Sequence, residues 1–502
     1  MSEQIPEWLS QRARLTPDRL AVQCEAVAWS YRDLDARASL VAAHLAECGV
    51  RAGERVALLA DSSPEYAAAV HGVPRAGAVL VPLNTRLTVD ELAWQISDCA
   101  ASIVIADAAH YQRGAAAAAA AGRAAPLDLV ALCAPDRPSP QPEVRWVRSE
   151  TVHTIIYTSG TTGRPKGALL TYGNHLWSAV GAALRLGLSA QDRWIACLPL
   201  FHVGGLSILI RAALVGSAVD LHRSFVPAAV NRAIDGGATI VSLVAVMLQR
   251  LLDDRAGRPY PPTLRCVLVG GGPLPHNLLR RAVAAGMPVV QTYGLTEAAS
   301  QVTTLAPEEA VTRLGAAGMP LFPTEIRILA PDGSPLPAGV PGEIAIRGLT
   351  VSPGYVGHSA VRPDGWFRTG DIGQLDADGY LTVLDRRDDL IISGGENISP
   401  AEVEAVLREH PAVIDAGVVG APDPIWGQRA VAFVVLAGDS QPDLEAFCRS
   451  RLAGYKTPRQ FIAVADLPRN AAGKLLRSEL RRWLTPYLEE GATATSDSEE
   501  ER

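Results

Sequence analysis

The feature that most constrains the fold is an alternation of strand-like and helix-like apolar patterns along the first ~150 residues. Residues 55–59 (RVALL) are typical of a short buried strand, and residues 76–81 of a second one that Pro82 closes. Between and before them, apolar residues recur at helical spacing, as in residues 34–45. Strands that alternate with helices predict an α/β domain with largely parallel sheets. We expect several sheets in this large N-terminal α/β domain.

The pattern changes beyond Gly348. Short strands separated by turn signals predict a β-rich subdomain that ends near Leu384. The charged pentad at residues 385–389 (DRRDD) contains no apolar residue and is a candidate hinge between domains. The turn signals are Asp332-Gly333, Asp364-Gly365 and Asp378-Gly379.

A small C-terminal domain follows the pentad. Ser399-Pro400-Ala401-Glu402 predicts a helix start, with Ser399 as cap, proline at the first position and Glu402 completing a capping box. We predict an N-terminal domain over residues 1–387, a mobile α+β domain over residues 388–486 and a disordered acidic tail over residues 487–502.

Composition and charge exclude several function classes. Hydrophobic residues make up 48% and charged residues 20% of the 502 residues, which is typical of a globular protein. The net charge is −7, and residues 489–502 hold six acids against one base, so the rest of the chain carries only −2. We therefore expect no nucleic-acid partner. The oligomeric state stays open, a homo-oligomer included.

The sequence also predicts neither a membrane insertion nor a disulfide framework. The most apolar run, residues 240–248, is about half as long as the ~20 residues of a membrane span. The N-terminus lacks the apolar region of a signal peptide. Seven cysteines are scattered without a CxxC pair, which is typical of reduced thiols in a cytoplasmic protein.

The strongest local signal is the segment 157–167 (YTSGTTGRPKG). Residues 152–157 before it are typical of a strand, and a helical pattern runs from Thr171 to Leu186 after it. Hydroxyls, glycines and one lysine form a loop of donors that can wrap a polyphosphate. The loop is not a Walker A motif, because Pro165 precedes Lys166 and Gly167 follows it.

This segment resembles the phosphate loop of the acyl- and aryl-CoA synthetase/adenylation-domain superfamily. Further motifs follow in the family's order: GGGP at 270–273, YGLTE at 293–297, TGD at 369–371 and Arg386. The likeness implies an ATP- or AMP-binding set that comprises Thr158, Ser159, Gly160, Thr161, Thr162, Lys166, Gly270, Gly271, Gly272, Tyr293, Gly294, Asp371 and Arg386.

The resemblance also implies roles within this set. Tyr293 would stack on adenine, Thr296 would bond the α-phosphate and Glu297 would hold Mg²⁺. Asp371 and Arg386 would bind the ribose hydroxyls, a task that suits a carboxylate acceptor and a guanidinium donor.

In this superfamily the C-terminal domain acts in two poses. By resemblance Lys474 is the adenylation lysine, whose charge would stabilise the developing negative charge. Asp388 would be the hinge about which the domain rotates to admit coenzyme A. Gly394 and Gly395 would line the tunnel for the coenzyme. Trp426 and Arg459 would contact its nucleotide.

The segment 198–207 (LPLFHVGGLS) and the following ILIR predict the site for the acid. By resemblance His202 gates the acyl site, and Ser207 belongs to the same substrate-binding set. Arg211 interrupts an apolar run, and a buried arginine needs an anionic partner. An acid with a second carboxylate would supply one.

Within the superfamily the chain is most similar to the o-succinylbenzoate–CoA ligases of menaquinone biosynthesis. Segments that carry this likeness are IPEWLSQRARLTPDR at 5–19, PLNTRL at 82–87, TYGNH at 171–175, QTYGLTE at 291–297 and LDRRDDLIISGGEN at 384–397. It implies a carboxylate–CoA ligase that uses ATP, Mg²⁺ and coenzyme A. Arg211 would recognise the aromatic carboxylate. Gly204 departs from the family pattern, because many members have serine there.

Three alternatives stay open. Another aryl–CoA ligase, of the benzoate or halobenzoate type, would share the chemistry but would leave Arg211 without a partner. A carrier-protein-loading adenylation enzyme would be expected beside carrier motifs, which this chain lacks. A non-catalytic nucleotide-binding relative would not need Glu297, Asp371 and Lys474 together.

Overall fold

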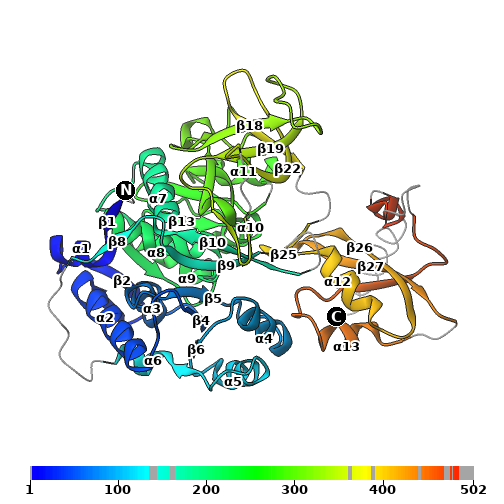
Figure 1. The fold of residues 1–502 in the computed structure, drawn as a ribbon. Coiled ribbons are helices and arrows are strands. Elements are labelled where there is room, and N and C mark those ends of the chain that lie inside the picture. The colour runs from blue at the N-terminus through cyan, green and yellow to red at the C-terminus, as the bar shows by residue number, and fades with distance from the viewer. Residues whose placement is uncertain are drawn as a thin grey trace, which may run out of the picture. The chain divides into compact units, whose positions relative to one another are not determined.

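The computed structural model describes residues 3–134, 144–158, 164–272, 274–359, 364–385, 390–438, 442–468, 475–477 and 479–484 (Figure 1). These residues group into two compact units. The first holds the described residues within Met1–Thr85, Val89–Thr158 and Lys166–Asp385. The second holds those within Arg86–Thr88, Ser159–Pro165 and Arg386–Arg502. A mixed α/β architecture with several sheets confirms the predicted fold class.

The first large sheet of unit 1 has a parallel centre and an antiparallel side. Its strands from β9 to β7 pair in parallel, whereas β9, β10, β20 and β21 pair antiparallel. The order is β21 (His358–Ser359), β20 (Gly354–Tyr355), β10 (Lys166–Thr171), β9 (Val152–Thr158), β5 (Val79–Pro82), β4 (Arg55–Leu59), β6 (Ile103–Ala106) and β7 (Leu127–Asp128).

The second large sheet of unit 1 is parallel from β15 to β2 and antiparallel at both ends. Its order is β17 (Met319–Pro320), β16 (Ser300–Thr304), β15 (Val289–Leu295), β14 (Cys266–Val269), β13 (Ile240–Leu243), β11 (Arg193–Ala196), β12 (Ala218–Leu221), β2 (Leu20–Cys24) and β3 (Val27–Ser30).

Two antiparallel sheets complete unit 1. The larger one, β18 (Glu325–Leu329), β19 (Gly342–Arg347), β22 (Phe367–Leu375) and β23 (Leu381–Asp385), is the β-rich subdomain. It begins at Glu325, before the expected start near Gly348. β1 (Gln4–Pro6) pairs with β8 (Trp146–Arg148).

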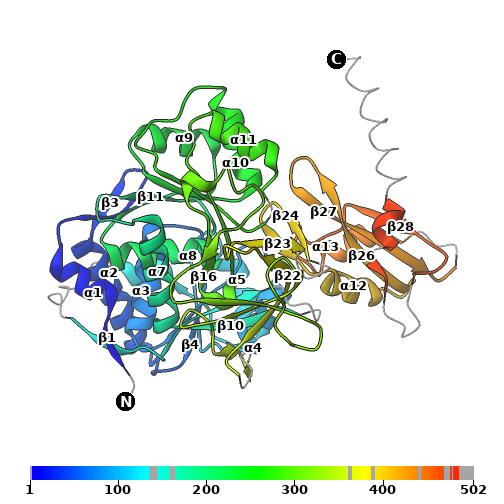
Figure 2. The same ribbon diagram turned by 90° about the horizontal axis from the view of Figure 1, so that it is seen from above.

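Helices cover both faces of the second sheet, because each of its central strands is buried on both sides. On β11, Trp194 and Ala196 face one apolar cluster, while Ile195 faces another, as the two-residue period of a strand requires. Figure 1 shows α2 (Tyr31–Glu47) beside α3 (Pro64–Arg75), and Figure 2 shows α9 (Pro227–Asp235), α10 (Ala245–Arg255) and α11 (His276–Ala284) grouped together.

The other helices of unit 1 connect strands or lie at the start of the chain. They are α1 (Trp8–Leu15), α4 (Val89–Asp98), α5 (Tyr111–Ala120), α6 (Leu129–Cys133), α7 (Tyr172–Leu186) and α8 (Val203–Val215), with the short 3₁₀ helices η1 (Thr296–Ala298) and η2 (Pro307–Glu309). No helix in the described ranges is long and apolar enough to cross a membrane.

Unit 2 is an α+β unit with one sheet. Its path is β25 (Glu396–Ile398), β24 (Ile391–Ser393), β27 (Gly427–Leu436) and β26 (Val413–Asp423), and β28 (Gln460–Ala463) pairs with β27. The helices α12 (Pro400–Arg408) and α13 (Leu444–Arg449) belong to this unit. The tail at residues 487–502 and the pentad residues 386–389 lie outside the described residues.

Several local predictions are confirmed and one is wrong. The predicted strand 55–59 is β4, and the predicted helix after Thr171 is α7, which Thr171 and Asn174 begin with a capping box. Helix α12 begins after Ser399 as predicted, but Ser399 forms no side-chain cap. The capping box fails because Oε1 of Glu402 accepts a hydrogen bond from Nζ of Lys456 at 2.8 Å.

A buried ion-pair network fastens the N-terminal helices to one another. The carboxylate of Glu7 accepts hydrogen bonds from the backbone N–H groups of Leu9 and Ser10 at the start of α1. Arg75, at the end of α3, donates to Glu7 at 2.7 Å and to Asp35 of α2 at 2.6 Å. Burial alone would raise the pKa of Glu7, but the positive charge of Arg75 lowers it to about 2.

We expect Arg75→Ala to destabilise the protein strongly, because it leaves two carboxylates buried without their cation. The loss should be about 3–5 kcal/mol, as is typical when one partner of a buried pair is removed. The matched control is Arg32→Ala on α2, whose ion pair with Asp18 is exposed and should contribute at most about 1 kcal/mol. Urea unfolding followed by circular dichroism measures both losses, and equal losses would contradict the prediction.

Candidate active site

The predicted phosphate loop joins two antiparallel strands. Thr158 is the last residue of β9 and Lys166 the first of β10, and the two residues pair across the ladder. The hydroxyl of Thr158 donates to the backbone carbonyl of Lys166 at 3.5 Å. Strand β10 was not predicted, because the segment is short and continues directly into α7. Ser159, Gly160, Thr161 and Thr162 lie outside the described residues.

The glycine motif at 270–272 follows β14 at the carboxyl end of the parallel strands. In α/β sheets this end is where ligands bind. A Cβ on Gly270 would lie 2.8 Å from Cγ2 of Thr292 on the neighbouring strand, so a side chain has no room there. Gly271 has φ +80°, a conformation that favours glycine. Gly272 is partly buried.

Strand β15 carries the YGLTE motif into a tight reversal. A Cβ on Gly294 would lie 1.9 Å from the backbone oxygen of Ser300, so this position excludes every side chain. After β15 the chain forms η1 and returns as β16 through Ala299 and Ser300, whose φ values are +52° and +112°. Non-glycine residues rarely adopt such values, and strained backbone of this kind clusters at functional sites.

The structure brings two predicted nucleotide-binding residues together. The phenol of Tyr293 donates to the carboxylate of Asp371 at 2.7 Å, and both side chains are buried. Asp371 lies on β22 of the β-rich subdomain, 78 positions further along the chain. Its backbone N–H donates to the hydroxyl of Thr369, which fixes the TGD turn.

Glu297, the predicted metal ligand, contacts a residue that the sequence analysis missed. Glu297 is 7% exposed, and its Oε1 accepts a hydrogen bond from the phenol of Tyr355 at 2.6 Å. Nζ of Lys166 lies 5.6 Å from the centre of the same tyrosine ring. Tyr355 on β20 therefore connects the phosphate-loop lysine with Glu297. Thr296 begins η1 next to Glu297.

Helix α8 carries the predicted acid-binding residues. His202 is the residue before its first turn, and the ring of Phe201 lies 4.7 Å from the His202 ring, centre to centre. Ser207 is buried and donates to the backbone carbonyl of Gly204 at 3.3 Å. A Cβ on Gly204 would contact only Cδ1 of Leu198, at 3.6 Å, so the family's usual serine would fit sterically.

Arg211 is a buried cation among neutral groups. It is 2% exposed, and its Nε and Nη2 have no hydrogen-bond partner. Burial lowers the pKa of Arg211 to about 10. Burial, followed by the charge of Arg211, lowers the pKa of His175 on α7 to about 3, so this neighbour is neutral. Over the described part of the chain, no carboxylate forms an ion pair with Arg211.

Unit 2 places Gly394 and Trp426 in contact. A Cβ on Gly394 would lie 2.7 Å from Cε3 of Trp426, and the backbone N–H of Gly394 donates to the carbonyl of Trp426. Gly394 and Gly395 have φ values of +59° and +88°. The indole of Trp426 is 47% exposed and open to a ligand. Arg459 adjoins β28, and its backbone N–H donates to the carbonyl of Ala430 on β27.

Lys474, Arg386 and Asp388 lie outside the described residues. Their predicted roles therefore stay predictions.

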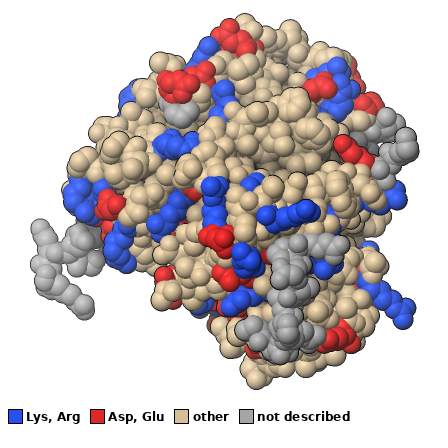
Figure 3. Space-filling view, turned by 90° about the vertical axis from the view of Figure 1, so that its left-hand side faces the viewer, with Lys and Arg blue, Asp and Glu red and all other residues tan. Residues whose placement is uncertain are grey.

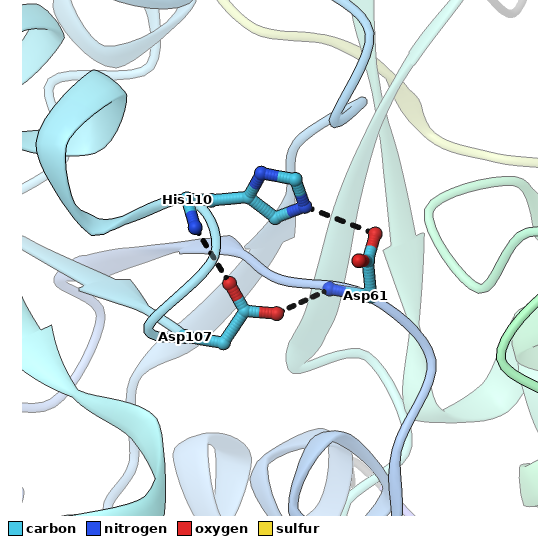
Figure 4. Close-up of side chains that lie close together, drawn as sticks. All are labelled: Asp61, Asp107 and His110. Carbon is cyan, nitrogen blue, oxygen red and sulfur yellow. Dashed lines mark hydrogen bonds and ion pairs between the residues drawn. The ribbon is translucent and has the colours of Figure 1, made fainter.

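Asp61, Asp107 and His110 form a further polar cluster that the sequence analysis missed (Figure 4). The two aspartates follow the parallel strands β4 and β6, which brings them together. Nδ1 of His110 faces Nη2 of Arg113 at 2.9 Å, and an arginine only donates. The ring proton is therefore on Nε2, 2.9 Å from a carboxylate oxygen of Asp61. Because both ring nitrogens of His110 have partners, the imidazole has no free nitrogen for a metal ion. The cluster instead links the segments that follow β4 and β6.

Charged side chains of both signs are interspersed on the face that Figure 3 shows.

Two family models match the chain. The model described as AMP-binding enzyme matches residues 9–356, and the one described as AMP-binding enzyme C-terminal domain matches residues 402–474. The 2-succinylbenzoate–CoA ligase of Geobacillus kaustophilus (strain HTA426) is 48% identical over 500 residues, which cover 97% of this chain and 99% of that protein. The enzyme of the same name from Bacillus cytotoxicus (strain DSM 22905 / CIP 110041 / 391-98 / NVH 391-98) is 45% identical over 493 residues, 96% and 99% of the two chains.

Solved structures give the same likeness. A double mutant of the o-succinylbenzoate CoA synthetase of Bacillus subtilis, bound with the product analogue OSB-NCoA, has a TM-score of 0.90 at 41% identity. The match covers 96% of this chain and 99% of the Bacillus subtilis chain. The same enzyme with ATP and magnesium ion has a TM-score of 0.73 at 41% identity, covering 95% and 100%. The chain therefore belongs to the AMP-binding enzyme family, among its 2-succinylbenzoate–CoA ligases.

Proposed function

We propose that this protein activates o-succinylbenzoate with ATP and transfers the acyl group to coenzyme A, a step of menaquinone biosynthesis. The products would be o-succinylbenzoyl-CoA, AMP and pyrophosphate. Membership in the ligase family supports the reaction type. The single observation that carries the choice of acid is Arg211, a buried guanidinium whose Nε and Nη2 have no hydrogen-bond partner, in a region where no described carboxylate pairs with it.

The first half-reaction joins the acid to the nucleotide. A carboxylate oxygen of the succinyl arm attacks the α-phosphorus of ATP, and the bond to pyrophosphate breaks. We assign Tyr293 and Asp371 to the adenosine and Lys166, with the loop 158–162, to the phosphates. Gly270, Gly271, Gly272 and Gly294 keep the backbone close enough for the nucleotide to approach. Lys474 would stabilise the charge that develops between carboxylate and phosphate.

Glu297 fits the role of magnesium ligand. Its carboxylate is buried, and no lysine, arginine or histidine within the described ranges forms an ion pair with it. A carboxylate oxygen is a ligand that Mg²⁺ prefers, and bound Mg²⁺ supplies neutralising charge to the phosphates. The phenol of Tyr355 occupies one lone pair of Oε1 and holds the carboxylate in place, which leaves Oε2 for the ion.

The second half-reaction transfers the acyl group. The thiol sulfur of coenzyme A attacks the acyl carbonyl, its proton leaves to solvent, and the bond to AMP breaks. We assign Gly394, Gly395, Trp426 and Arg459 to the coenzyme and Asp388 to the hinge that changes the pose of the C-terminal domain. We place the enzyme in the cytoplasm, because all seven cysteines are free thiols.

The acid would be held through the carboxylate on its aromatic ring, which is ortho to the succinyl arm. The carboxylate on the ring would accept hydrogen bonds from Nε and Nη2 of Arg211, which is the bidentate geometry that a guanidinium favours. His202 would contact the acyl side. A benzoate without a second carboxylate would leave Arg211 buried and uncompensated, which disfavours the halobenzoate alternative.

The reaction type is tested by pyrophosphate exchange. We expect radiolabelled pyrophosphate to enter ATP when o-succinylbenzoate is present and coenzyme A is absent, because the adenylate forms before the thiol is needed. Omission of the acid should abolish the exchange. Release of ADP and phosphate in place of AMP and pyrophosphate would contradict the proposal.

The choice of acid is tested by Arg211→Ala. We compare o-succinylbenzoate with 4-oxo-4-phenylbutanoate, which keeps the succinyl arm and lacks the ring carboxylate. Loss of a buried pair of about 3–5 kcal/mol should lower kcat/KM for o-succinylbenzoate about a hundredfold or more. The analogue should not lose activity by this mechanism. An equal loss on both acids would mean that Arg211 serves folding or another partner.

The two poses are tested by a reciprocal pair of variants. Lys474→Ala should slow adenylate formation about 10²–10³-fold, the cost of a lost oxyanion donor, and spare thioester formation from supplied adenylate. Asp388→Pro fixes φ at the hinge and should do the opposite. The two half-reactions are measured separately by pyrophosphate exchange and by thioester release. If a variant slowed both half-reactions equally, the role proposed for the substituted residue would be wrong.

A further inference from the structure

We propose that Trp194 and Ser242 are positioning residues that hold Arg211 ready for the ring carboxylate of the acid. This inference rests on the proposed function, because it assigns how the acid-recognition site is built. Neither residue touches the reacting atoms; both would act through Arg211.

Trp194 is fixed from two sides. It lies on β11, is 1% exposed, and is among the largest fully buried side chains. Its indole Nε1–H donates to Oγ of Ser242 at 3.0 Å. Ser242 lies on β13, which pairs in parallel with β11 through Trp194 and Ile240. The hydrogen bond therefore crosses between adjacent strands and sets the orientation of the indole.

The indole is placed to support Arg211. The guanidinium carbon of Arg211 lies 5.7 Å from the centre of the Trp194 ring, within the range of a cation–π contact. Such a contact attracts the cation through the face of the ring and does not consume its N–H donors. This fits the state of Arg211, whose Nε and Nη2 are buried and uncommitted.

A flexible arginine without such support would lose affinity for its ligand. Its side chain has several rotatable bonds, and holding it in one rotamer costs conformational entropy on binding. Among the described residues, no hydrogen bond holds Nε or Nη2 of the Arg211 side chain. The face of the Trp194 ring thus positions Arg211, as a protein carboxylate could. Unlike a carboxylate, it leaves the N–H groups of Arg211 available to the ligand.

The experiment measures a selectivity ratio, kcat/KM for o-succinylbenzoate divided by kcat/KM for 4-oxo-4-phenylbutanoate. We expect Trp194→Leu to lower this ratio about tenfold, mostly through KM, because a desolvated cation–π contact is lost. Trp194→Phe keeps a ring face and should restore most of the ratio. Ser242→Ala should lower it about threefold by freeing the indole.

A matched control separates positioning from general packing. Trp29 on β3 of the same sheet is also buried and has the guanidinium of Arg37 4.3 Å from its ring centre. Trp29→Leu should leave the selectivity ratio unchanged even if it lowers stability. If Trp194→Leu fails to fold, as judged by circular dichroism, Trp194→Phe and Ser242→Ala decide the question.

The double variant distinguishes this inference from the proposed function. If Trp194 acts through Arg211, then Trp194→Leu should not change the ratio further in the Arg211→Ala background. A further loss there, or an equal loss on both acids, would overturn the positioning role. If Arg211→Ala lowers the ratio while Trp194→Leu and Ser242→Ala do not, the positioning role fails and the proposed function stands. If Arg211→Ala leaves the ratio unchanged, Arg211 does not recognise the ring carboxylate, and both the proposed role of Arg211 and the positioning role fail.

Discussion

The close backbone approach at Gly294 is the constraint on which the proposed nucleotide-binding region depends. Because no Cβ fits between Gly294 and the oxygen of Ser300, β15 can turn through η1 and return as β16 within a few residues. The turn is held by the hydroxyl of Ser178, which donates to the carbonyl of Ala299 at 2.7 Å. This geometry carries Tyr293 to Asp371 and Glu297 to Tyr355, so two contacts from different sheets depend on one missing side chain.

The protein treats two of its buried arginines in opposite ways. Arg75 is enclosed by Glu7, Asp35 and Ser39, and its charge is compensated within the fold. Arg211 is buried to a similar degree, yet its neighbours are an indole and a neutral histidine. Fully paired charges stabilise a structure or cost it little, whereas an unpaired one is a standing cost. Under the proposed function, the fold bears this cost at Arg211 because the bound acid supplies the missing anion.

The sequence predicted several local elements of the candidate site but not the contacts between distant segments. Strand β4 and the start of α7 follow from residues adjacent in the chain, and the YGLTE and TGD motifs follow from resemblance to the family. Tyr355 could not be found in this way, because its contacts with Lys166 and Glu297 depend on the pairing of β10 with β20. The capping box at Ser399 failed for the same reason: a tertiary partner, Lys456, engages Glu402. The contact between Trp194 and Arg211 could not be predicted either, because it joins β11 to α8.

The two recognition tasks are built on different strands, which explains how one family can keep its chemistry and vary its acid. The proposed nucleotide contacts come from the carboxyl end of β15, from η1 and from β22, where backbone closeness fixes each group. The proposed acid contacts come from α8, where Arg211 lies over the Trp194 ring of β11 and Trp194 donates to Ser242 of β13. Because side chains can change without moving a backbone reversal, substitutions around Arg211 can alter the preferred acid while Tyr293, Glu297 and Asp371 keep their places. Selectivity is therefore the more readily altered property of this enzyme.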